Sequence, residues 1–86
     1  MPRISSFLGI AIYMYFSEHG IAHFHAIYGQ YEAVIGINPI RILDGKLPKR
    51  VQSLVFEWAN LYQTELQKNW ELAREGEPLP GIPPLE

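Results

Sequence analysis

The spacing of hydrophobic residues divides the chain into a first part typical of strands and a second part typical of a helix. Before residue 47, β-branched and aromatic residues are frequent, and short apolar runs are separated by turn residues. From Pro48 to Glu75 there is no glycine, and apolar residues recur at intervals of three, four and seven. We therefore predict an α+β fold, in which a small antiparallel sheet of three to four strands packs on one long C-terminal helix.

Three strands are expected, at about Gly9–Phe16, His23–Tyr28 and Tyr31–Ile37, with a short fourth strand at Arg41–Leu43. The pair Gly29-Gln30 separates the second strand from the third, and a two-residue loop with glycine first favours a type II′ turn. This turn fixes the register of the hairpin. The resulting pairs are Tyr28 with Tyr31, Ile27 with Glu32, Ala26 with Ala33, His25 with Val34 and Phe24 with Ile35.

This register gives the hairpin an apolar face and a mixed face, because paired residues on neighbouring strands share a face. The apolar face, which we expect to point into the core, carries Phe24, Ala26, Tyr28, Tyr31, Ala33, Ile35 and Ile37. The mixed face carries His23, His25, Ile27, Glu32, Val34 and Gly36. Matching apolar residues on the first strand adds Ile10, Ile12, Met14 and Phe16 to the core, and Ala11, Tyr13 and Tyr15 to the mixed face.

The helix is expected over about residues 48–75, with Pro48 in its first turn and Gly76 just beyond its end. Such a helix is about 42 Å long, roughly twice the length of a six-residue strand. We therefore expect an apolar surface to extend beyond the sheet and to form an interface with a second copy or a partner protein. Its residues are Leu66, Trp70 and Ala73. The alternative is a kinked or split helix with a new start near Thr64, where Thr64–Gln67 match a capping box.

A single domain of residues 1–86 accommodates these elements, with the sheet at about 4–43, the helix at about 48–75 and a tail at 76–86. The tail contains four prolines and two glycines and is expected to be extended and irregular. It either crosses the domain through Leu79, Ile82 and Leu85 or extends away from it, and the sequence leaves both arrangements open.

Composition excludes several classes of protein. Hydrophobic residues make up 48% and charged residues 19%, which excludes a wholly disordered chain. The absence of cysteine excludes disulfide frameworks, cysteine-based metal sites and thiol nucleophiles. The longest apolar run has ten residues, against about twenty for a helical membrane span, and no signal-cleavage motif follows it. We therefore expect a cytoplasmic protein with no membrane segment, whose net charge of −2 gives no general attraction to nucleic acid.

Several motifs along the chain occur in a familiar order. They are His19–Ala26, Asp44–Pro48, Trp58, Glu65-Leu66 and Asn69-Trp70. Together they resemble the family of small bacterial proteins called domain of unknown function 4160, over nearly the whole chain. Members commonly have a proline pair where this chain has Ile21-Ala22. The resemblance implies no established activity and no catalytic residue; it implies a two-gene, toxin–antitoxin-like module with another small protein encoded nearby.

The three histidines, His19, His23 and His25, are the first candidate site. Alternate residues of a strand point to the same side, so His23 and His25 present their imidazoles together. With His19 or Glu32 as a third ligand they would form a site for a divalent transition metal. Alternatively, His23, His25 and Glu32 would act as catalytic acid–base groups, although no serine has a supporting motif as nucleophile. A purely structural role, with imidazoles bonded to nearby carbonyl groups, stays open.

Two other groups of residues are candidates for binding. Tyr13 and Tyr15 share the mixed face with the histidines, where they would stack bases, or else pack under the tail or across a dimer. Four cations lie within ten positions, against one acid, Asp44. A helix start with cations can bind phosphate or nucleic acid, although a solvated patch has the same composition. These cations are Arg41, Lys46, Lys49 and Arg50.

Three functions are compatible with these features. The surplus apolar helix surface favours an interaction component of a toxin–antitoxin-like module, acting through self-association or a small partner protein. The histidines favour a metal-dependent hydrolase or an RNA-cleaving toxin. The cations favour a nucleic-acid-binding module. The sequence alone names no reaction and no substrate.

Overall fold

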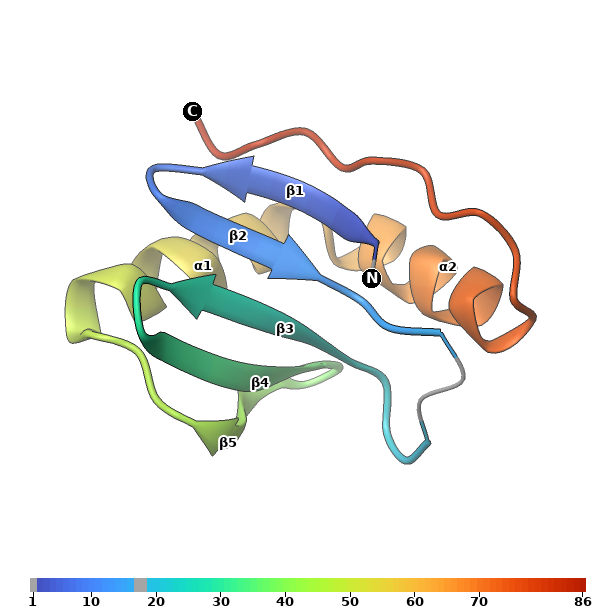
Figure 1. The fold of residues 1–86 in the computed structure, drawn as a ribbon, viewed down its shortest axis with the longest axis horizontal. Coiled ribbons are helices and arrows are strands. Elements are labelled where there is room, and N and C mark those ends of the chain that lie inside the picture. Colours follow the sequence, from blue (N-terminus) through green and yellow to red (C-terminus); the bar gives the residue numbers. More distant parts are fainter. Residues whose placement is uncertain (1, 17–18) are drawn as a thin grey trace.

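A five-stranded antiparallel sheet with two helices against one face forms the fold (Figure 1). The computed structural model describes residues 2–16 and 19–86. In chain order the elements are β1 (Arg3–Phe7), β2 (Ile10–Tyr13), β3 (His23–Tyr28), β4 (Tyr31–Ile37), β5 (Ile40–Gly45), α1 (Lys49–Leu61) and α2 (Gln63–Arg74). Each strand pairs with the next, so the spatial order is the sequence order. The predicted α+β class is confirmed, with five strands in place of three to four.

The hairpin of β3 and β4 has the predicted register at every pair from Phe24–Ile35 to Tyr28–Tyr31. At its turn, Gly29 has a φ of +59° whereas Gln30 does not have a positive φ, as a type II′ turn requires. The face predicted to be apolar points toward the helices, and five of its residues are fully buried. These are Phe24, Ala26, Ala33, Ile35 and Ile37.

The first hairpin differs from the prediction because β1 was not expected. Its turn is Leu8-Gly9, with φ of 52° and 80°, the two positive values of a type I′ turn, which leucine rarely adopts. A bulge between Arg3 and Ser5 buries Ile4 and Ser5 together, so the alternation typical of a strand is interrupted. The next strand, β2, ends at Tyr13. The expected core position of Phe16 is therefore wrong, and its side chain is 43% exposed.

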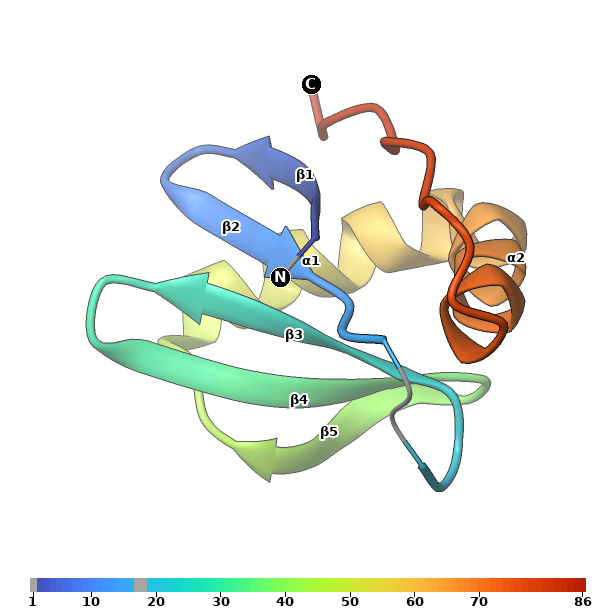
Figure 2. The same ribbon diagram turned by 45° about the vertical axis from the view of Figure 1, so that its right-hand side comes forward.

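The predicted single long helix is also wrong, and the alternative of two helices is correct. The chain leaves helical geometry at Tyr62, where φ is −117° and ψ is 28°, and α2 continues in a new direction (Figure 2). The side-chain Nε2 of Gln63 donates to the Ile37 carbonyl oxygen over 2.7 Å and links α2 to β4.

This change of direction corrects the predicted interface. Leu66, Trp70 and Ala73 are 0%, 4% and 1% exposed, because α2 turns their stripe onto the end of the sheet and the tail. Within this fold the three side chains belong to the core of the chain itself. The apolar surface that was expected to extend beyond the sheet is therefore absent from the described residues.

The proline-rich tail crosses the domain and does not extend away from it. It begins after a Schellman motif, in which the N–H of Gly76 bonds to the Ala73 carbonyl and that of Glu77 to the Leu72 carbonyl. From there it returns past α2 toward the outer edge of β1 (Figure 1). Ile82 is buried and its N–H donates to the Ile4 carbonyl oxygen over 2.8 Å.

Two buried side chains on the helices also hold the tail. The indole N–H of Trp58 donates to the Pro83 carbonyl over 2.8 Å, and Nδ2 of Asn69 donates to the Pro80 carbonyl over 2.9 Å. Trp58 lies at the centre of the core, with its ring centroid 5.4 Å from that of Phe7 and 5.7 Å from that of Phe24. Among the described residues, no helix is long and apolar enough to cross a membrane.

Candidate functional site

The face of the sheet turned away from α1 and α2, here called the open face, carries no helix of the described residues (Figures 1 and 2). The pairing of the strands places one row of residues across all five of them, because directly paired residues share a face. From β1 to β5 this row is Arg3, Tyr13, His25, Val34 and Asp44. His25 therefore lies on the middle strand, at the centre of the open face.

Five residues around this centre form the open-face cluster: Tyr13, Tyr15, His23, His25 and Glu32. The structure brings together the residues that the sequence assigned to the mixed face, through a series of ring and side-chain contacts. The rings of Tyr13 and Tyr15 are parallel within 3°, with centroids 6.3 Å apart. The Tyr15 ring meets that of His25 edge-on at 4.4 Å.

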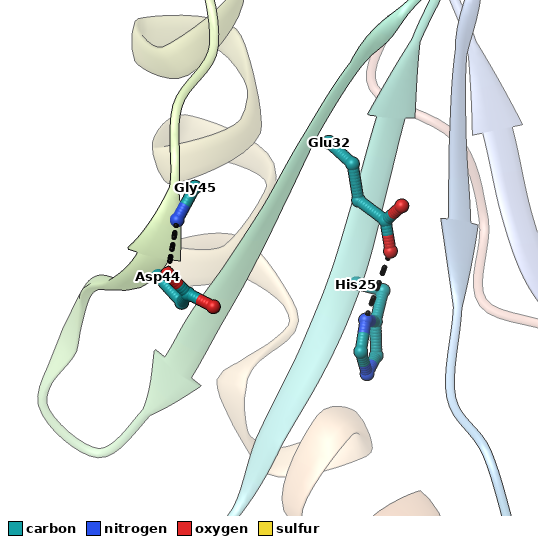
Figure 3. Close-up of polar contacts among 4 residues, drawn as sticks. All are labelled: His25, Glu32, Asp44 and Gly45. Carbon is teal, nitrogen blue, oxygen red and sulfur yellow. Dashed lines mark hydrogen bonds and ion pairs between the residues drawn. The ribbon is translucent and has the colours of Figure 1, made fainter.

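His25 is oriented by a carboxylate on the neighbouring strand (Figure 3). Its Nδ1 lies 3.4 Å from Oε2 of Glu32, and the N–H donates because an ionised carboxylate only accepts. The side chains of His25 and Glu32 are 14% and 54% exposed, so the pair sits at the border between protein and solvent. With Nδ1 directed at Glu32, Nε2 is the second ring nitrogen, and in this tautomer of a neutral imidazole it is an acceptor.

His23 has a different environment from His25, although both lie on β3. Its Nδ1 donates to the Ile21 carbonyl oxygen over 2.7 Å, and its ring packs 4.8 Å from that of Trp70 on α2. The prediction that both imidazoles face away from the helices is therefore correct for His25 and wrong for the ring of His23. The cause is the break at Tyr62, which brings α2 against the start of β3. The two imidazoles remain neighbours, with centroids 5.5 Å apart.

The three predicted metal ligands do not converge. His19 is exposed in the connection before β3, and within residues 2–16 and 19–86 no three His, Cys, Asp or Glu side chains are grouped to hold an ion. The predicted ligand set of His19, His23 and His25 is thus not assembled in this fold.

The predicted basic patch is divided between two ends of one strand. Arg41 is near the start of β5 and Lys46 directly follows the strand, five residues later, which corresponds to about 16 Å of extended chain. Arg41 pairs with Gly36 and lies on the open face, whereas Lys46 follows β5 and Lys49 and Arg50 are in the first turn of α1. All four side chains are exposed. The nearby Asp44 carboxylate accepts a bond from the Gly45 N–H over 2.9 Å (Figure 3).

Arg3 is a candidate residue that sequence reasoning missed. It is exposed and pairs with Tyr13, so it lies on the open face at the β1 edge, opposite to the edge that carries Arg41. The signal that would have found it is the Leu8-Gly9 turn, since a strand before that turn places Arg3 across from Tyr13. The open face therefore carries one arginine on each edge strand.

The cluster contains acid–base groups, and none of the serines in the described part of the chain lies beside them; Ser17 is outside the described residues. Ser5 faces the core, Ser6 pairs with Ala11 near the β1–β2 turn, and Ser53 lies on α1. A histidine oriented by a carboxylate can take up and release protons during a reaction. Such acid–base groups can act on a substrate that brings its own nucleophile.

Comparison with known proteins gives one match. No curated protein and no solved structure matches this chain significantly. The model of the family described as "Domain of unknown function (DUF4160)" matches residues 9–71, well over half of the chain. The matched part includes the whole open-face cluster and both tryptophans, and it leaves out β1 and the tail. The chain therefore belongs to the DUF4160 family.

Proposed function

We propose that this chain cleaves RNA and serves as the toxin-like member of a bacterial two-gene module, with the open face as its active surface. The observation that carries this proposal is the His25–Glu32 pair at the centre of an aromatic-lined sheet face. RNA supplies its own nucleophile, the 2′-hydroxyl group. Acid–base groups and phosphate-binding cations are then sufficient for cleavage.

The residues of the cluster have separate roles in the reaction. Nε2 of His25 takes the proton of the 2′-hydroxyl, whose oxygen attacks the adjacent phosphorus. The bond from phosphorus to the 5′ oxygen breaks, that oxygen receives a proton from a water molecule, and His25 afterwards releases its own proton to the solvent. The products are a 2′,3′-cyclic phosphate and a 5′-hydroxyl end, so atoms and charges balance without a co-reactant.

Three charged side chains support these steps. Glu32 orients His25 and balances the positive charge that the imidazole gains when it takes up the proton. Arg3 and Arg41, one on each edge strand, provide cations for the phosphates on either side of the cleaved bond.

The test is cleavage of a labelled single-stranded RNA in the presence of a chelator. One acid–base group is worth about 10²–10⁴-fold in rate, so His25→Ala should lose about that much. An exposed ion pair contributes up to about 1 kcal/mol, so Glu32→Gln should lose up to about fivefold. The matched controls are His19→Ala, an exposed histidine outside the cluster, and Glu57→Gln, an exposed glutamate on α1. Both should cleave at the rate of the unsubstituted protein.

The nature of the products gives an independent check. An oligonucleotide of the same sequence made of DNA should stay intact, because it lacks the 2′-hydroxyl. RNA fragments should end in a cyclic phosphate. Full activity of a folded His25→Ala protein, or intact RNA after incubation with folded protein at high concentration, would reject the proposal.

A second candidate function is that of an interaction component of the same module. The favouring observation is that apolar and aromatic side chains on the open face, among them Ala11, Ile27 and Val34, are only half-buried. The helix stripe that first suggested this role is covered, so the surface for a small partner protein would be the sheet. Ile27→Lys should then abolish co-purification with the product of the neighbouring gene, whereas Leu61→Lys, on the exposed side of α1, should not. Co-purification that survives Ile27→Lys would exclude this surface.

A further inference from the structure

We infer that Tyr13 and Tyr15 form a base-binding platform that directs unpaired RNA bases to His25. This inference rests on the proposed function and names its substrate as single-stranded RNA. Its starting observation is the geometry of the two rings, which are parallel within 3° and project from positions two residues apart.

Parallel rings on an open sheet suit the stacking of bases. The two ring planes share one orientation, so bases of an extended strand that stack on them keep a single direction. The centroids of the Tyr15 and His25 rings are 4.4 Å apart, and the two ring planes meet at 74°. A base stacked on Tyr15 therefore brings its ribose close to the imidazole that is to take the 2′ proton.

The tail does not cover this platform. Its carbonyl groups at Pro80 and Pro83 accept bonds from Asn69 on α2 and Trp58 on α1, which pack on the opposite face of the sheet. Figures 1 and 2 show the tail passing α2 and the β1 edge. Packing of the two tyrosines under the tail, one of the alternatives considered from the sequence, is therefore wrong.

The charges on the open face favour stacking as the main source of affinity. Arg3 pairs directly with Tyr13, and Arg41 lies on the far edge strand in line with His23. Two phosphate contacts predict a slope of about −1.4 for the logarithm of the binding constant against the logarithm of salt concentration. Paired RNA exposes no base face for stacking, and its deep major groove does not admit a sheet, so duplexes should bind more weakly.

The experiment measures binding of a fluorescent, short 2′-O-methyl RNA, which cannot be cleaved because its 2′ oxygen carries no proton. Base–aromatic stacking predicts that Tyr15→Leu weakens binding about fivefold to 150-fold, and that Tyr13→Leu has an effect of the same order. Tyr15→Phe keeps the ring and should bind within about twofold of the unsubstituted protein. Tyr31→Leu is the matched control, since Tyr31 is exposed at the start of β4 and lies outside the cluster.

The outcomes separate this inference from the proposed function. Unchanged binding by folded Tyr13→Leu and Tyr15→Leu proteins would overturn the platform, and so would equal affinity for a duplex of the same sequence. If RNA is still cleaved in that case, the proposed function stands without it. Loss of binding in both leucine variants with retention in Tyr15→Phe would support the platform even if the protein cleaved no RNA.

Discussion

Replacing Asn69 by leucine tests how the tail is held against the helices. The Asn69 side chain is 2% exposed, and its Nδ2 donates to the Pro80 carbonyl oxygen over 2.9 Å. Leucine has the same branching and number of heavy atoms but no donor, so the substitution removes one hydrogen bond and leaves a carbonyl group without its partner. Removing a partner from a buried polar group costs about 1–3 kcal/mol.

The expected loss of stability lies in the lower half of that range. Pro80 is exposed, so water can reach part of its carbonyl group when the amide is absent. We therefore expect about 1.5 kcal/mol, which for a domain of this size lowers Tm by about 6–12 °C. Thermal unfolding followed by circular dichroism measures this shift, and urea unfolding measures the free energy directly.

Asn60 provides the matched control. It is exposed on α1, and its Nδ2 bonds only to the Phe56 carbonyl within the same helix, so Asn60→Leu should change the free energy of unfolding by less than about 0.5 kcal/mol. Equal Tm values for Asn69→Leu and the unsubstituted protein would refute the role given to this bond. Faster proteolysis of the tail in Asn69→Leu alone would support it.

Three further substitutions have defined outcomes. Gly29→Ala should cost about 1 kcal/mol, because φ is +59° and no atom lies within 4 Å of the added Cβ; Gly81→Ala, which lacks a positive φ, should cost far less in the same urea titration. Ser5→Ala should leave stability unchanged or raise it by up to about 1 kcal/mol, since the buried Ser5 Oγ has no hydrogen-bond partner, and a fall in Tm would contradict this. Trp58→Phe should cost about 2–3 kcal/mol in urea unfolding, because it removes the donor to the Pro83 carbonyl and leaves a cavity; a cost below about 1 kcal/mol would show that this bond is unimportant.

The hairpin of β3 and β4 could be predicted residue by residue because its turn and its alternation of apolar and polar residues indicate the same register. Gly29 in first position selects the turn, the two-residue loop sets the register, and the apolar residues then mark the buried face. The approach of Glu32 to His25 follows from the same register, because the two residues are diagonal neighbours. Most of the open-face cluster was therefore accessible from the sequence.

The elements that were missed lack a local signal. A bulge disrupts the alternation of β1, and its turn uses a leucine at positive φ where asparagine, aspartate or glycine is usual. At Tyr62 neither glycine nor proline marks the end of α1, so no residue type in the sequence indicates the break. The packing of His23 on Trp70 depends on that break, which explains why the location of its ring could not be derived from strand parity.

The last segment of the fold to be translated supplies acceptors that the earlier segments need. Trp58 and Asn69 leave the ribosome before Pro80 and Pro83, so their buried donors have no carbonyl partners while the chain is still growing. Until residues 80–83 emerge, these two donors can bond only to water, so the nascent helices stay hydrated where the tail later packs. The least regular part of the fold thus completes the hydrogen bonding of the helices, and a chain that stopped at the end of α2 would leave both donors without these carbonyl partners.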